Sequence, residues 1–286
     1  MKTGKVIIVG RPNAGKSTLI NNLVGKKISI ISPKPQTTRK IIQGLYWDKR
    51  GQIVFLDTPG IFAKTKDPVA KKISGLAEQE LGRADVIVYL VDRSRSRGEE
   101  ENRILGAVRA VNRPKIIAIN KIDLARPNYL HEYQFLEDEF DAWVEISALK
   151  RQHLKTLLEK IFAFLPEGEP IFDPKLFEAF PALNITPEEF VAEIIREKSF
   201  FVLHQEVPYT IGVKVEEIRE EADLFYIKAS ILTTADRYKA IIVGHRGQTI
   251  KRIGTQARKE LELITNKKVF LDLEVVTDPH WYQEES

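Results

Sequence analysis

The chain has 286 residues, 43% of them hydrophobic and 29% charged, which is typical of a globular protein with room for two domains. The absence of cysteine excludes disulfides, cysteine-ligated zinc, iron–sulfur clusters and thiol catalysis. A net charge of +4 is mild, so a nucleic-acid site would have to come from locally clustered basic residues. Because no apolar run is long enough to cross a membrane and no signal peptide precedes the first strand, we expect a cytoplasmic protein.

A phosphate-binding loop is predicted near the start of the chain. Residues 5–9 form an apolar, strand-like run, and residues 17–24 have a helical pattern. Between them stands the motif G-x-x-x-x-G-K-S, made of Gly10, Arg11, Pro12, Asn13, Ala14, Gly15, Lys16 and Ser17. Glycines permit the tight turn, and backbone N–H groups and the helix N-terminus attract phosphate, so we expect Lys16 to reach the outer phosphates, Ser17 to bind magnesium and Thr18 to complete the site. The alternative, a glycine turn with an exposed lysine, is disfavoured by the flanking strand and helix.

A second polar motif ends a predicted hairpin. After a polar, proline-broken stretch at residues 26–39, the β-rich residues 41–47 and 52–56 flank a short turn with glycine and predict two antiparallel strands. The second strand ends in Asp57, Thr58, Pro59 and Gly60. A carboxylate at the C-terminal end of a strand beside a phosphate loop is placed to organise magnesium, usually through water. Alone, this tetrapeptide is a common turn, but behind a phosphate loop we interpret it as part of a nucleotide site.

The following strands predict a guanine-binding motif. We expect a loop at residues 61–68, a long helix to about residue 83, and a strand at 84–92 whose continuous apolar run is typical of a buried parallel sheet. A charged helix at residues 99–112 precedes a strand at 115–119, which ends in Asn120, Lys121, Ile122 and Asp123. Guanine, unlike adenine, presents two adjacent N–H donors, which a carboxylate such as Asp123 accepts as a pair. A lone N-K-x-D motif usually faces solvent, but at this distance from a phosphate loop it indicates guanine.

The first domain closes with one more strand and one more helix. Residues 143–146 form a strand that ends in Ser147, Ala148 and Leu149, whose backbone N–H groups we expect near the guanine carbonyl. Residues 151–165 form the closing helix. The alternation of strands and helices predicts an α/β P-loop domain with a mostly parallel sheet over residues 1–166.

The ordered motifs GRPNAGKS, QTTR, DTPG and NKID resemble those of small GTPases of the translation-factor-related class, over roughly the first 165 residues. The resemblance implies that Thr38, favoured over Thr37, binds magnesium and senses the γ-phosphate, and that Gly60 belongs to the second switch. Where Ras-like relatives carry a glutamine that orients the attacking water, this chain has Ile61. The phosphate loop, Lys16 and magnesium would then stabilise the transition state, and intrinsic hydrolysis of GTP to GDP should be slow.

Asn13 has two interpretations. The chain is similar to GTPases in which an asparagine of the phosphate loop helps to hold a potassium ion in place of an arginine finger, which implies potassium-stimulated hydrolysis. The alternative role for Asn13 is to cap the loop.

A proline-containing connector at residues 167–185 leads to a second domain at residues 186–286. That domain opens with a predicted capping box, in which Thr186 is the N-cap and Glu189 its partner, with Pro187 at the first helical position. In chain order we expect a helix at 187–198, strands at 209–219 and 224–234, a helix at 237–243, a G-x-x-G turn, a helix at 248–264 and a strand at 268–276.

This element order resembles a type II KH domain, a smaller α+β fold that binds single-stranded nucleic acid. The turn and the basic residues that follow it are the expected RNA contacts: Gly244, His245, Arg246, Gly247, Lys251, Arg252 and Arg258. The G-x-x-G turn clamps phosphates through close backbone approach, although such turns more often only join two helices. Ile242, Ile250 and Ile253 line a groove for bases or pack in the core.

The combination of the two domains resembles the bacterial GTPases that assist ribosome assembly. The resemblance implies RNA-stimulated hydrolysis, binding to the 3′ end of 16S rRNA, a role in rRNA processing and maturation of the 30S subunit, and loose association with the inner membrane. We expect a monomer. Three alternatives stay open: a P-loop kinase or ATPase, an RNA-binding module that uses nucleotide as a structural ligand, and a GTPase that acts on the large subunit or tRNA.

Overall fold

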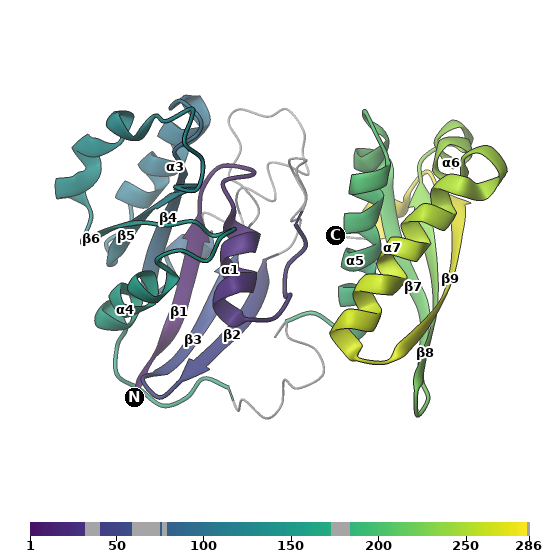
Figure 1. Ribbon diagram of the computed structural model, residues 1–286, viewed down its shortest axis with the longest axis horizontal. Coiled ribbons are helices and arrows are strands. Elements are labelled where there is room, and N and C mark those ends of the chain that lie inside the picture. Colours follow the sequence, from purple (N-terminus) through teal and green to yellow (C-terminus); the bar gives the residue numbers. More distant parts are fainter. Residues whose placement is uncertain (32–40, 59–74, 76–78, 173–183, 285–286) are drawn as a thin grey trace. The chain divides into compact units, whose positions relative to one another are not determined.

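The computed structural model describes residues 1–31, 41–58, 75, 79–172 and 184–284 (Figure 1). The described chain divides into two compact units. One contains Met1–Ile31 and continues to Asn184, and the other begins at Ile185. Each unit has its own sheet. Among the described residues, no helix combines the length and apolar character needed to cross a membrane.

The first unit is built on a six-stranded sheet in the order β2-β3-β1-β4-β5-β6. Its strands are β1 (Lys2–Val9), β2 (Ile42–Asp48), β3 (Gly51–Asp57), β4 (Val86–Asp92), β5 (Lys115–Asn120) and β6 (Ala142–Glu145). Only the β2–β3 pair is antiparallel, which confirms both the predicted hairpin and the mostly parallel sheet. All seven residues of β4 are buried, as its apolar run predicts.

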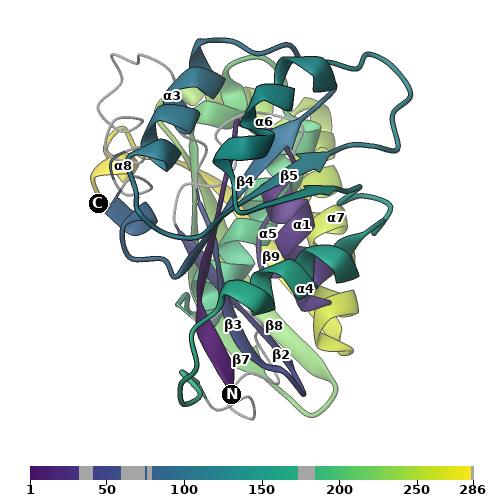
Figure 2. The ribbon, with the colours of Figure 1, turned by 90° about the vertical axis from the view of Figure 1, so that its left-hand side faces the viewer.

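Helices cover both faces of this sheet. The described helices are α1 (Lys16–Val24), α3 (Glu99–Arg109) and α4 (Leu154–Phe164), with short 3-10 turns at Leu130–Glu132 and Gln134–Glu139. Figure 2 shows α1 and α4 on one side of the sheet and α3 on the other. Because the parallel strands all run the same way, β1, β3, β4 and β5 end at one edge, where the polar motifs follow them.

Some boundaries in this unit differ from the predictions. The closing helix begins at Leu154 rather than at residue 151, because Arg151 and His153 have a left-handed backbone with φ of 56°. The charged helix ends at Arg109, three residues earlier than predicted. The two 3-10 turns between β5 and β6 were not predicted. The expected loop at residues 61–68 and most of the helix after it lie outside the described residues.

The described ends of the connector are attached to the first unit. The Gln52 side chain on β3 accepts hydrogen bonds from the N–H groups of Ile171 and Phe172, at 2.7 and 2.9 Å, and donates one to the Phe172 carbonyl at 2.6 Å. At the other end, the Asn184 side chain donates to the Ile41 carbonyl at 2.7 Å and accepts from the Gln43 N–H at 2.8 Å. The connector is therefore fastened to the β2–β3 hairpin at both of these points.

The second unit has a three-stranded sheet with helices packed against it. Its elements are α5 (Pro187–Val202), β7 (Ile211–Glu220), β8 (Leu224–Thr233), α6 (Asp236–Val243), α7 (Gln248–Thr265), β9 (Lys268–Thr277) and α8 (Trp281–Glu284). The sheet order is β7-β8-β9, with β7 antiparallel and β9 parallel to β8. The order of elements agrees with the prediction. Helix α5 is longer than predicted, a 3-10 turn at Val207–Thr210 makes β7 begin at Ile211 rather than at residue 209, and α8 is additional.

The capping box that opens α5 is confirmed. The Thr186 hydroxyl accepts a hydrogen bond from the Glu189 N–H at 3.2 Å, and the Glu189 carboxylate accepts one from the Thr186 N–H at 2.9 Å. Pro187 stands at the first helical position, where its missing N–H has no partner to lose.

Candidate nucleotide site and nucleic-acid interface

The phosphate loop lies between β1 and α1 and is closed by its own lysine. Lys16 is buried, and its Nζ donates to the carbonyls of Gly10 and Arg11 at 2.9 and 3.0 Å. Burial lowers the pKa of Lys16 from 10.5 to about 8, and the negative charges of Asp57 and Glu101 act in the opposite direction. This ammonium is therefore held where the loop backbone converges, which suits contact with outer phosphates.

Two glycines of the loop are required by their surroundings. A Cβ on Gly10 would lie 2.3 Å from the Leu90 carbonyl oxygen. Gly15 has a φ of 104°, and a Cβ there would lie 2.4 Å from the Asn120 side-chain nitrogen. Any side chain at either position would push the loop away from β4 or β5. Thr18 lies in the first turn of α1, partly exposed.

Asn13 is exposed at the tip of the loop and has a left-handed backbone with φ of 64°. Helix α1 has Gly15 as its N-cap, with no side-chain hydrogen bond to the cap. The two expected roles of Asn13, capping the loop and holding potassium, both stay predictions.

The predicted magnesium pair is brought together between the first turn of α1 and the end of β3. The Ser17 hydroxyl donates to Oδ2 of Asp57 at 2.7 Å, and Asp57 is fully buried. Burial raises the pKa of Asp57, while the Ser17 hydrogen bond and the Lys16 charge lower it. Oδ1 of Asp57 is buried without a hydrogen-bond donor among the described residues. A buried carboxylate oxygen beside a hydroxyl fits the all-oxygen coordination that magnesium prefers.

The other predicted switch residues are not all described by the structure, and Thr58 has a structural contact. The buried Thr58 hydroxyl donates to the Ile8 carbonyl at 2.9 Å, so its side chain joins β3 to β1. Thr38, Pro59 and Gly60 lie outside the described residues.

Asn120 ties the guanine motif to the phosphate loop. Its side chain donates to the Ala14 carbonyl at 2.7 Å and accepts from the Ala148 N–H at 2.9 Å. The Ser147 hydroxyl donates to Asp123 at 2.6 Å, which orients this partly exposed carboxylate. The Ala148 N–H, expected near the guanine carbonyl, thus has a protein acceptor in this structure.

Asp92 belongs to the same site, although this role was not predicted from the sequence. This buried carboxylate pairs with the Lys121 ammonium at 2.6 Å and accepts hydrogen bonds from the N–H and hydroxyl of Ser94, at 2.9 and 2.6 Å. A usable signal was present, because Asp92 ends an apolar strand as Asp57 does, and parallel strands end at the same edge.

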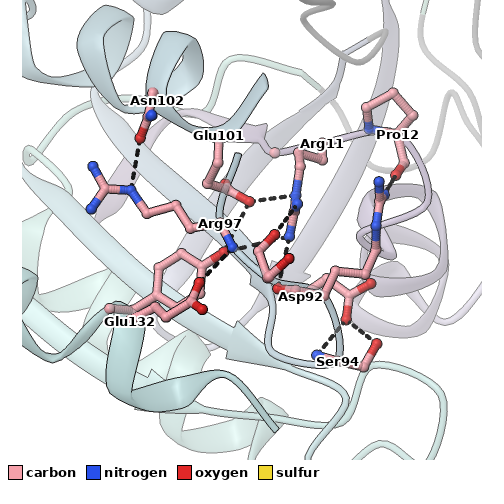
Figure 3. A network of polar contacts seen from close by, with 12 residues as sticks. Arg11, Pro12, Asp92, Ser94, Arg97, Glu101, Asn102 and Glu132 are labelled. Atoms are coloured by element: carbon pink, nitrogen blue, oxygen red, sulfur yellow. Dashed lines mark hydrogen bonds and ion pairs between the residues drawn. The ribbon is translucent and has the colours of Figure 1, made fainter. Parts of the chain in front are cut away.

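The side chain of Arg11 departs from the expectation of a nucleotide contact. Figure 3 shows its guanidinium turned toward Glu101 on α3, with which it forms an ion pair. It also donates to the carbonyls of Ser96 and Arg95 at 2.9 and 3.3 Å. The carbonyl of Pro12, the next loop residue, accepts from Arg95 at 3.3 Å. Arg11 and Pro12 thus contribute backbone to the loop, while the Arg11 side chain anchors it from behind.

The predicted G-x-x-G turn joins α6 to α7 in the second unit. Gly244, Arg246 and Gly247 have φ of 71°, 49° and 75°. A Cβ on Gly244 would lie 2.1 Å from the Thr249 hydroxyl, whereas one on Gly247 would meet nothing within 4 Å. His245 and Arg246 are exposed at the tip of this turn. The geometry permits close backbone approach of a ligand.

A groove of about 340 Å³ lies between α7 and β9, beyond the turn. It is lined by Ile250, Lys251, Gly254, Thr255, Arg258, Leu271, Asp272 and Leu273. β9 is the last strand of the sheet order, so along the groove its outer edge has backbone N–H and carbonyl groups without a neighbouring strand. The groove therefore has basic side chains on its helical wall and hydrogen-bonding groups on its strand wall.

The structure separates the three isoleucines that the sequence left open. Ile242 and Ile253 are fully buried in the core, whereas Ile250 is half-buried and lines the groove. Lys251, Arg252 and Arg258 are all exposed, and only Arg252 does not line the groove. The groove residues on β9 and Gly254 were not predicted. A glycine inside a helix was the signal, since it leaves room where a side chain would fill the groove.

Comparisons with known proteins agree with this division. A family model described as a 50S ribosome-binding GTPase matches residues 5–121, and one described as a KH domain matches residues 206–280. The chain is 41% identical to GTPase Era of Halothermothrix orenii, over 99% of this chain and 96% of that protein. It is 40% identical to GTPase Era of Aquifex aeolicus, over 98% of this chain and 95% of that protein.

Two solved structures are similar over almost the whole chain. One is a variant of Aquifex aeolicus Era bound to GDP·AlF4⁻, and the other is Era in complex with MgGDPNP and nucleotides 1506–1542 of 16S ribosomal RNA. Each has a TM-score of 0.89 and 40% identity, and each match covers 98% of this chain and 95% of that chain.

Proposed function

The chain belongs to the Era family of GTPases, and from this premise we propose that it is a GTP-driven switch that binds the 3′ end of 16S rRNA during maturation of the 30S subunit. The observation that carries the proposal is the groove between α7 and β9, beside an exposed G-x-x-G turn. A related Era binds nucleotides 1506–1542 of 16S rRNA together with MgGDPNP. The basic wall of the groove suits a phosphate backbone, and the strand edge suits bases.

Different residues of the nucleotide site bind the phosphates, the guanine and the magnesium ion. Lys16 and the loop N–H groups bind the phosphates of GTP, and Asp123 accepts the two N–H donors of guanine. Ser17 and Asp57 would hold magnesium, with Thr38 as a further ligand, and the metal supplies charge neutralisation at the phosphates. Asn120 keeps the two halves of the site in register through its bonds to Ala14 and Ala148.

Hydrolysis is expected to be slow without help. Ile61 has no group that could orient the attacking water, and Gly60 of the second switch offers only its backbone. We propose that potassium, held with the aid of Asn13, and bound RNA both raise the rate. GTP turnover measured in equal concentrations of sodium and potassium chloride tests the first part, and equal rates would reject it. Single-turnover hydrolysis with and without RNA separates a timed switch from a module that uses nucleotide only as a structural ligand.

The connector offers a route from nucleotide state to RNA binding. Asn184 binds Ile41 and Gln43, which follow the predicted switch residue Thr38 closely in sequence. Two residues after Asn184, Thr186 caps the first helix of the KH domain. We propose that GTP changes the strand that follows the switch, that Asn184 passes this change to the connector, and that the RNA surface then opens.

Asn184→Ala tests this route directly. RNA affinity is measured by fluorescence anisotropy with a labelled 16S 3′-end oligonucleotide, with GDP and with a non-hydrolysable GTP analogue. The wild type should bind more tightly with the analogue, and Asn184→Ala should reduce that preference. Asn128→Ala is the matched control, since Asn128 is also exposed and also makes a side-chain bond to backbone, at 3.0 Å to the Leu130 N–H. Equal RNA affinity in both nucleotide states of the wild type would reject the coupling, because a ligand shifts an equilibrium only by differential affinity.

Other targets and nucleotides are distinguished by two further measurements. Crosslinking followed by RNA sequencing should recover the 3′ end of 16S rRNA; recovery of large-subunit rRNA or tRNA instead would reassign the substrate. Competition between ATP and GTP should leave GTP bound, and ATP preference would favour a kinase or ATPase.

Location and oligomeric state are also proposals. We infer a monomer, to be checked by light scattering. Peripheral association with the inner membrane is implied by the family resemblance alone, and co-sedimentation with anionic lipid vesicles tests it.

A further inference from the structure

We propose that Glu101 is a positioning residue for nucleotide binding, which acts by holding Arg11 and, through it, the phosphate loop. Glu101 lies in the first turn of α3, outside the sequence motifs of the nucleotide site, and forms an ion pair with Arg11 of the phosphate loop. This role rests on the proposed function of the nucleotide site, and the residues that carry it form a buried network behind the loop (Figure 3).

The Arg11 side chain is fixed from several directions. Its side chain is 5% exposed and that of Glu101 is 1% exposed, so the ion pair between them is shielded from water. The remaining guanidinium N–H groups donate to the Ser96 and Arg95 carbonyls in the segment between β4 and α3, and to the Tyr133 hydroxyl at 3.4 Å. A planar guanidinium with this many partners has one available orientation.

Glu101 is itself held in place by two aromatic residues. The Tyr89 hydroxyl on β4 donates to Oε1 of Glu101, and the Tyr133 hydroxyl donates to Oε2 at 3.2 Å. Both rings are fully buried in the core of this unit. The carboxylate on α3 is therefore tied to β4 through Tyr89 and, through Tyr133, to the segment where the two 3-10 turns meet. An anchor of this kind transmits the rigidity of the core to the loop.

The loop depends on that anchor at the atoms that hold Lys16. The two carbonyls that accept hydrogen bonds from the Lys16 ammonium belong to Gly10 and Arg11. If the Arg11 side chain were released, the backbone that places these carbonyls would lose its attachment to α3. The loop N–H groups would then have to be ordered by the phosphates at the time of binding, which reduces affinity.

A purely structural role is the competing explanation, and the physics of buried ion pairs separates the two. Removal of one partner leaves an uncompensated buried charge and destabilises the fold, whereas replacement of both partners by apolar residues often leaves stability equal or higher. A pair that served stability alone could be replaced in this way without loss of function. A pair that positions the loop could not.

The test compares GDP affinity with thermal stability in the full chain. Glu101→Gln and Arg11→Met should each lower the melting temperature and weaken GDP binding, measured by titration with a fluorescent GDP analogue. The double variant Arg11→Met, Glu101→Leu should regain the melting temperature while GDP affinity stays at least about tenfold weaker than in the wild type. Wild-type affinity in the double variant would overturn the proposal.

A matched control comes from the same helix. Arg109 on α3 pairs with Glu139 at 2.6 Å, and both of these side chains are exposed at the surface. Arg109→Met with Glu139→Leu should leave GDP affinity unchanged. Arg11→Lys provides a second test that keeps the buried charge but loses the planar fork to Ser96 and Arg95. It should bind GDP more weakly than the wild type although it remains folded, and undiminished affinity in this variant would also overturn the proposal.

Discussion

The nucleotide site and the RNA-binding surface are built in opposite ways. In the first, Lys16, Asp57 and Asn120 are buried and each is tied to a protein partner or neighbour. In the second, Arg246, Lys251 and the other basic residues are exposed on a turn and one helix. Buried polar groups give fixed geometry and high specificity, whereas exposed charges give attraction that salt screens. A single substitution should therefore have a large effect in the first site and a small, additive effect in the second.

The largest effect is expected at Asp123, where nucleotide specificity depends on one carboxylate. Asp123→Ala removes both acceptors of the guanine N–H pair, and two charge-assisted hydrogen bonds correspond to about a 1,000-fold loss of GDP affinity. Titration with a fluorescent GDP analogue measures it. Asp123→Asn provides the control, because its amide N–H should favour xanthine, which carries a carbonyl where guanine has an amino group. A variant at Asp123 with unchanged GDP affinity would contradict the comparison.

Replacement of Lys16 should lower the affinity for GDP but raise the stability of the nucleotide-free protein. Lys16→Met is expected to weaken GDP binding about 100-fold, because the ammonium contact with phosphate is lost. In nucleotide-free protein at pH 7 the same change should raise the free energy of unfolding by up to about 3 kcal/mol, because burial lowers the pKa of Lys16 from 10.5 to about 8.

The stability difference between the wild type and Lys16→Met should depend on pH. Below pH 8 the lysine is protonated in both the folded and the unfolded state, so the whole penalty for burying the charge is present. As pH rises from 8 to 10.5, the folded protein loses the proton first and the penalty disappears. Urea unfolding of the wild type and the variant at pH 7 and pH 9.5 should therefore show a stability difference that shrinks at the higher pH. If the difference in the free energy of unfolding were the same at both pH values, the buried charge of Lys16 would not be its cause.

The contrast between the sites also explains what the sequence could predict. Motifs of consecutive residues, such as the phosphate loop and the G-x-x-G turn, carry their chemistry locally, and they were located together with the strands and helices around them. Asp92 and Glu101 could not be assigned in this way, since their roles depend on which strand ends and helices meet in space. The direction of the Arg11 side chain depends on the same long-range packing. Ile250 and Ile253 differ for a similar reason, because the packing of α7 against the other elements of its unit decides which side chain is covered.

A smaller effect, on RNA affinity, is expected at the two glycines of the G-x-x-G turn. Like the residues of the nucleotide site, these glycines act through fixed geometry, whereas the basic residues around them act through charge. Gly244→Ala meets both a φ of 71° and the Thr249 hydroxyl, whereas Gly247→Ala meets only a φ of 75°. The first should weaken RNA binding about tenfold, and the second, which costs about 1 kcal/mol of backbone strain, should have less effect. Anisotropy with the 16S oligonucleotide measures both, with GDP affinity as a check on the first domain. Equal losses at the two positions would mean that space beside Gly244 is unimportant.

The smallest effects on RNA affinity are expected at the basic wall of the groove. They are best measured through the dependence of RNA affinity on salt concentration. Lys251→Gln and Arg258→Gln should each weaken RNA binding about fourfold at 0.15 M salt and reduce the slope of log affinity against log salt by about 0.7, since each removes one phosphate contact to a single strand. The two losses should add, because screened surface charges act nearly independently. Lys228→Gln is the matched control, as this exposed lysine of β8 lies on the face of the sheet away from the helices. A loss of more than about a hundredfold for one of these groove variants, with no change in the salt slope, would mean that the groove works through fixed geometry as the nucleotide site does.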